Sequence, residues 1–233
     1  VITKPGAPPI RANILIKEGL IKAFCTNISI PFGAKDIVID SHFFYSGFID
    51  ALNHTGLKRE EQTPQTGRGG GGQAQQGPRT VPGQATLEQS GVTPQKSVVK
   101  TYSTQESSVK DMRNQGITVT HVVPTGLMLP GKGSVISLKD GGRSDAHVLR
   151  KDMSTYARLA PTRGYAPGTV IGVMSKFRDV YKNAEILHKN ALAFDLGKDG
   201  VSRPAYAEEY NAMIPVVNKK YSLKQLTSKT YIK

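Results

Sequence analysis

The chain has 233 residues, 38% of them hydrophobic, and its 31 Lys and Arg residues exceed 18 Asp and Glu residues to give a formal net charge of +13. This length is enough to bury a sizeable core in one large domain or two small ones. The basic residues are scattered and aromatic residues are not interleaved with them, which disfavours a nucleic-acid-binding surface. An acidic partner segment would explain the excess positive charge equally well.

The cysteine count and the hydropathy of the chain exclude further classes of protein. Cys25 is the only cysteine, so an intrachain disulfide and a CxxC-type metal site are excluded. No stretch approaches the ~18 consecutive apolar residues of a transmembrane helix. Val1 is not followed by a basic region and an apolar core, so we expect any exported form to be mature or trimmed.

Short β-strands are predicted in the first 50 residues. Residues 12–16 and 20–24 flank a Lys-Glu-Gly turn and predict a hairpin. Residues 27–34 predict a short strand with a Pro-Phe-Gly turn, and the β-branched residues 36–40 predict a third strand. Residues 43–49 are apolar at nearly every position, which is typical of a strand buried on both faces in a parallel sheet.

A low-complexity segment rich in Gly, Gln and Pro spans residues 62–85. A phosphate-binding loop is one interpretation of such a segment. However, it lacks a Gly-Lys-Ser/Thr ending, a flanking helix start and regular glycine spacing, so a flexible solvated loop is favoured.

Regular structure is predicted to resume near Thr93. Ser107 and Ser108 can begin a short helix that ends before Gly116. Strands are then predicted at residues 117–123, 134–138 and 146–150.

Two helices are predicted in the last third of the chain. Apolar residues recur every three or four positions between residues 168 and 193, which predicts a long amphipathic helix packed on a sheet. A membrane-surface helix is a weaker interpretation, because the polar face carries Asp179 and Glu185 as well as basic residues. A shorter helix is predicted at residues 206–213, ending near Pro215.

The histidines carry the candidate chemistry, although none has metal-binding spacing to another. His54 has the best position, because it ends a strand predicted to be buried and follows Asp50 by four residues, as in an Asp-x-x-x-His metal site at a barrel mouth. His121 lies in a strand just before a Gly/Pro loop, where a structural or a catalytic role is open. The GxSxG pattern of a nucleophile elbow is absent, so no catalytic residue is assigned.

Three segments together resemble the entry into the amidohydrolase superfamily. They are the Ile-Leu-Ile-Lys-Glu-Gly-Leu-Ile run at residues 14–21, the Val-Ile-Asp of residues 38–40 and the Gly-Phe-Ile-Asp of residues 47–50. The run at residues 128–136 is similar to a secreted, imidazolonepropionase-like branch of Gram-negative bacteria, which also carries a Gly/Gln-rich insertion after its first barrel strand. The resemblance covers residues 10–220.

The resemblance implies a small β-sandwich beside a (β/α)₈ barrel and the metal-assisted hydrolysis of C–N bonds in cyclic amides or peptides. It implies a divalent metal (zinc, manganese or iron) and His54 as its ligand, with Asp50 and His121 at the edge of the site. Two positions depart from the pattern: Leu52 replaces the first histidine of the family's His-x-His, and Ser46 replaces proline. The HxH motif is therefore degenerate.

The resemblance gives an α/β fold: a small β-sandwich segment plus the first βα units of an incomplete TIM-like (β/α)₈ barrel. The expected divisions are a sandwich segment at 1–46, the first barrel strand with the start of its loop at 47–61, a flexible insertion at 62–92 and a partial barrel at 93–233. The remaining ligands, a lysine, two histidines and an aspartate, are expected outside these 233 residues, because a barrel of about 250 residues does not fit.

Such a partial barrel has unpaired strand edges, so we expect a second chain or a cleaved C-terminal segment to complete it. Two function classes follow. The first is an amidohydrolase-type hydrolase completed by its partner, with this chain inactive alone. The second is a non-catalytic, oligomeric subunit or scaffold of a cell-envelope complex, and the resemblance implies the periplasm or envelope for either.

Overall fold

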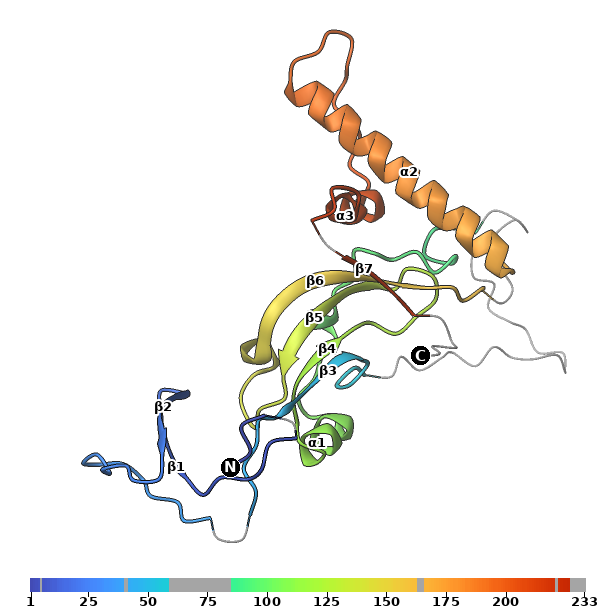
Figure 1. The fold of residues 1–233 in the computed structure, drawn as a ribbon. Helices are drawn as coiled ribbons and strands as arrows, with labels where there is room; N and C mark the ends of the chain where they lie inside the picture. The colour runs from blue at the N-terminus through green and yellow to red at the C-terminus, as the bar shows by residue number, and fades with distance from the viewer. Residues whose placement is uncertain (5, 40–41, 59–84, 163–165, 221, 227–233) are drawn as a thin grey trace, which may run out of the picture. The chain divides into compact units, whose positions relative to one another are not determined.

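The computed structural model describes residues 1–4, 6–39, 42–58, 85–162, 166–220 and 222–226. The chain divides into two compact units, Val1–Phe48 and Ile49–Lys233. Figure 1 shows their elements.

The first unit contains a two-stranded antiparallel sheet. Strand β1 (Asn13–Lys17) pairs with β2 (Leu20–Cys25), which confirms the predicted hairpin. The turn places Glu18 at φ 55° and Gly19 at φ 74°. Positive φ at both central residues gives the backbone twist that a tight two-residue hairpin needs, and glycine adopts it at no steric cost.

The other strands expected in this unit are wrong. Residues 27–34 form no strand, although the turn is present and the Ala34 amide donates to the Pro31 carbonyl at 3.1 Å. Residues 36–39 are irregular, and Asp40 lies outside the described residues. A β-branched segment becomes a strand only where a neighbouring strand pairs with it, and the described residues of this unit supply none there.

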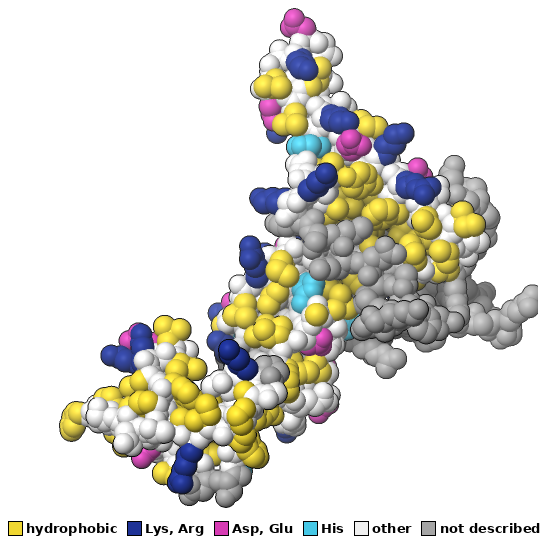
Figure 2. All heavy atoms as spheres, in the orientation of Figure 1, with side chains coloured by type: hydrophobic (Ala, Val, Ile, Leu, Met, Phe, Trp, Pro, Cys, Tyr) yellow, Lys and Arg dark blue, Asp and Glu magenta, His cyan; other side chains and the backbone are white. Residues whose placement is uncertain are grey.

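The apolar segment at residues 43–49 is not a buried strand. Strand β3 begins only at Phe48 and ends at Asn53, and the side chains of Phe43 and Ile49 are 67% and 75% exposed. None of the described side chains in Val1–Phe48 is buried. The hydrophobic side chains of this unit therefore lie on its surface, as Figure 2 shows.

The larger sheet has five strands in the order β3-β4-β5-β6-β7. The later four are β4 (Ile117–Val122), β5 (Gly131–Ser137), β6 (Val148–Arg158) and β7 (Ser222–Leu226). The β4–β5 and β5–β6 pairs are antiparallel, whereas β6 and β7 are parallel.

The expected parallel arrangement of these strands is therefore wrong for β4, β5 and β6. Their connections are residues 123–130 and 138–147, and the second holds only a single 3₁₀ turn, η2 (Ser144–His147). A parallel crossover needs a dozen residues or more, usually with a helix, so connections this short reverse the chain. The connection from β6 to β7 contains two helices and returns in the parallel direction.

The predicted helices are confirmed, with one boundary corrected. They are α1 (Ser107–Asn114), α2 (Val170–Asp195) and α3 (Glu208–Val217), and a 3₁₀ turn, η1 (Val98–Lys100), precedes them. Helix α3 continues past Pro215 rather than ending there, since proline removes one backbone donor without preventing a final turn. None of the helices in the described part of the chain is long and apolar enough to cross a lipid bilayer.

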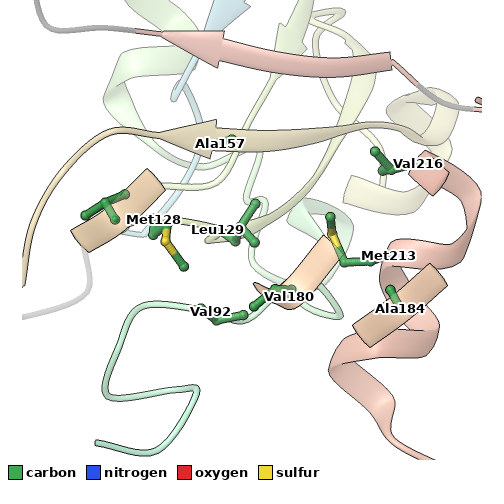
Figure 3. Packing of buried hydrophobic residues seen from close by; sticks show 9 residues of the cluster. Val92, Met128, Leu129, Ala157, Val180, Ala184, Met213 and Val216 are labelled. Carbon is green, nitrogen blue, oxygen red and sulfur yellow. The ribbon is translucent and has the colours of Figure 1, made fainter. Parts of the chain in front are cut away.

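Two hydrophobic clusters hold this unit together. In the first, Val180 of α2 and Met213 of α3 pack with Ala157 of β6 and with Leu129 (Figure 3). The second joins η1 and α1 to the sheet through Val98, Val109, Val122, Ile136 and their neighbours.

The two faces of the sheet differ in character. Strand neighbours point to opposite faces, and directly paired residues share one. Ile136 pairs with Thr120, and Val135 pairs with His121, so the packed Ile136 and His121 lie on opposite faces. The helices thus cover the face of Ile136, and His121 and Ser154 lie on the other.

Candidate functional site

His54 follows β3 and is held at the end of β4. Its Nδ1 lies 2.8 Å from the Val123 carbonyl oxygen, which can only accept a hydrogen bond. Nδ1 therefore carries the proton in this contact, and Nε2 keeps its lone pair. Metal-binding histidines are commonly oriented by this kind of hydrogen bond to a backbone carbonyl.

Tyr156 of β6 supports the His54 ring from the side. The ring centroids are 5.8 Å apart with an interplanar angle of 70°, which is an edge-to-face contact. Tyr156 is buried, and this burial raises the pKa of its phenol above the ordinary value. Tyr156 is therefore neutral near pH 7 and serves as a rigid wall for His54.

His121 forms a brace across three strands. Its Nδ1 lies 3.2 Å from the Ala51 carbonyl of β3, and its Nε2 lies 2.8 Å from the Ser154 hydroxyl of β6. The carbonyl needs a donor, so Nδ1 is protonated and Nε2 accepts the Ser154 proton. Both His121 and Ser154 are buried, so this contact joins the strands beneath the surface.

Gly133 of β5 makes room for this brace. A β-carbon at Gly133 would lie 2.8 Å from His121 Nε2 and 2.9 Å from the Ser154 hydroxyl. Gly133 is paired directly with Ser154, so the imidazole passes over the glycine to reach β6.

Asp50 is turned toward its own strand. Its Oδ2 accepts from the Asn53 amide at 2.7 Å, and its Oδ1 accepts from the Leu52 backbone N–H at 3.2 Å. No hydrogen bond or ion pair between described residues joins Asp50 to His54. The Asp50 contacts form a local turn that shapes the end of β3, and the role of Asp50 at the edge of a site stays a prediction.

The described residues fit a single metal ligand rather than a metal centre. Within the described ranges, no group of three or more His, Cys, Asp and Glu side chains is placed to hold a metal ion. His54 offers one lone pair, and Leu52 has no donor atom to add to it.

A pocket of about 330 Å³ is lined in part by the segments that follow His54 and Val123 in the chain. Its wall includes Leu57, whose N–H donates to the His54 carbonyl at 3.4 Å, and Pro124, which follows the carbonyl that holds the His54 ring. Lys58, Glu88 and Lys96 are its charged residues. The Glu88–Lys96 ion pair has an N–O distance of 3.1 Å and is largely exposed.

Sequence reasoning found His54 and His121 but missed Tyr156, Ser154 and Gly133. The sequence gives a partial indication of them, because residues two apart in a strand lie on the same face of a sheet. Ser154 and Tyr156 have this spacing in β6, and Gly131 and Gly133 have it in β5. Which of these residues lie opposite one another depends on the register of β5 and β6, and this register shifts between Gly133 and Val135.

No family model matches the sequence, and no curated protein matches it. The fold, however, is similar to the crystal structure of an amidohydrolase from Thermotoga maritima MSB8, with a TM-score of 0.67 and 20% sequence identity. The match covers 91% of this chain and 52% of the neighbour, so this chain spans about half the neighbour's length. The chain thus has an amidohydrolase-like α/β fold.

Proposed function

We propose that the chain is part of an amidohydrolase-like enzyme that hydrolyses a C–N bond, as in a cyclic amide or a peptide, near His54. The orientation of His54 carries this proposal: its Nδ1–H is held by the Val123 carbonyl, which leaves Nε2 available. The fold likeness supports the class of protein. In this view, the described residues form one part of an amidohydrolase-like fold that other residues complete.

A bound zinc, manganese or iron ion would lower the pKa of a water molecule and make it a nucleophile. His54 is the one described residue that we assign to such an ion. Val123 and Tyr156 fix the ring of this ligand, and Asp50 stabilises the turn on which it stands. The other ligands would come from outside the described residues, so no catalytic step is derived.

Completion by a second chain or a C-terminal segment is part of the proposal. Its support is the first unit, where no described side chain is buried and residues such as Val38 and Phe43 are 75% and 67% exposed. We expect this chain alone to self-associate or to be incompletely folded in sedimentation velocity. A monodisperse, folded monomer would contradict this expectation.

A non-catalytic role as a subunit or scaffold of a cell-envelope complex is the second candidate. Leu52 favours it, since this side chain stands where the resembled family has a metal-binding histidine. A site that has lost one ligand can still hold one metal ion, so Leu52 is compatible with both the enzyme and the scaffold.

Metal content and hydrolysis of the native assembly separate these candidates. We expect about one equivalent of zinc, manganese or iron per chain and hydrolysis of a panel of N-acyl amino acids and cyclic amides. His54→Ala should lose both the metal and the activity, because Nε2 is removed. His188→Ala, on α2 away from this site, is the matched control. An assembly without stoichiometric metal would leave the scaffold role.

A further inference from the structure

The pocket lined by Leu57 and Pro124 has the chemistry of a carboxylate site. Its charged lining residues are two lysines and one glutamate, an excess of one positive charge. Lys58 is exposed and takes part in none of the ion pairs between described residues. An ammonium group of this kind can accept an anionic ligand without first losing a protein partner.

The Lys96 ion pair is a weak competitor for such a ligand. The side chains of Lys96 and Glu88 are 51% and 72% exposed. Exposed ion pairs contribute little, because water screens the charges and two long side chains must be ordered. A ligand carboxylate can therefore share Lys96 with Glu88 or displace it.

The rest of the pocket fits an apolar body with polar ends. Leu57, Pro124, Leu127 and Pro130 supply apolar walls, and the exposed Thr125 supplies a hydroxyl. The loop passes close to itself here, since a β-carbon at Gly126 would lie 2.6 Å from Pro130 Cβ. Small-molecule sites combine mostly apolar walls with a few placed polar groups in this way, at volumes from about 300 Å³.

We infer that this pocket binds a small organic carboxylate with an apolar body, held by Lys58 and Lys96. Binding of the carboxylate does not rest on the proposed function.

Calorimetric titration of the native assembly with N-acetyl-leucine and with its neutral amide tests the inference. We expect the acid to bind at least about fivefold more tightly than the amide, with an advantage that falls as salt is raised from 50 to 500 mM. Lys58→Gln and Lys96→Gln should each weaken binding of the acid about two- to fivefold. Glu88→Gln should leave it unchanged or strengthen it, because Lys96 is released.

Lys110→Gln is the matched control, since Lys110 is an exposed lysine on α1 that does not line the pocket. All four variants alter surface side chains, and circular dichroism checks that each is folded. Equal affinity for acid and amide, no measurable binding of either, or equal effects of Lys58→Gln and Lys110→Gln would overturn the carboxylate site. Acid-selective binding without hydrolysis in the native assembly would keep the site and remove the proposed enzyme.

Discussion

At the residue scale, Gly133 leaves no room for a β-carbon on the face of the sheet that carries His121. An alanine there would place its β-carbon 2.8 Å from both His121 Nε2 and Val123 Cγ1. We expect Gly133→Ala to lower the free energy of unfolding by about 1–3 kcal/mol, as overpacking does elsewhere. Urea denaturation measures this change.

Gly168→Ala is the control for that substitution, because a β-carbon at Gly168 would meet no atom within 4 Å. Its expected effect is close to zero. Equal stability of the two variants would show that the His121–Ser154 contact does not need the space above Gly133.

The same residues show what sequence could and could not predict of the site. The position of His54 directly after a strand was predictable, and its role as a metal ligand stays a prediction. The hydrogen bonds of Asp50 to Asn53 and to the Leu52 amide were not predicted. Hydrogen bonds this local compete with any longer-range partner, and side-chain type alone does not reveal which one prevails.

At the element scale, the beginning of α2 depends on Thr169. The Thr169 hydroxyl accepts from the Gly172 N–H at 3.2 Å and caps the first turn. We expect Thr169→Ala to destabilise the chain by about 1 kcal/mol, since a helix N–H loses its acceptor. Thr169→Ser keeps the oxygen and should recover most of the loss in the same denaturation experiment. If serine were no better than alanine, the hydroxyl would not act as the cap.

Elements were predictable where their signal is local. The long helix follows from apolar spacing of three and four residues, and the first hairpin from a turn between two apolar runs. Strand direction is set by the length and content of the connections, which is why β4 to β6 came out antiparallel. The irregular residues 36–39 show the same limit, because strand formation there needs a partner strand.

At the scale of the whole molecule, the described core belongs to one unit. Every buried hydrophobic residue among the described ranges lies between Val92 and Val216, and none lies in Val1–Phe48. A two-stranded sheet without a packed face is marginal in water. The first unit should therefore open far more often than the second, and local opening is what exposes a chain to proteases.

Limited trypsin digestion of the chain alone tests this difference. We expect cleavage after Lys17, Lys22 and Lys35, which are all exposed, well before cleavage after Lys132 within β5. A second chain or segment that covers the first unit should slow the early cuts and leave the Lys132 rate unchanged. Lys189 on α2 serves as the internal control, because it is exposed on a regular helix of the second unit. If trypsin did not cleave the isolated chain early after Lys17, Lys22 and Lys35, the first unit would be stable by itself. Its exposed apolar surface would then not require a partner.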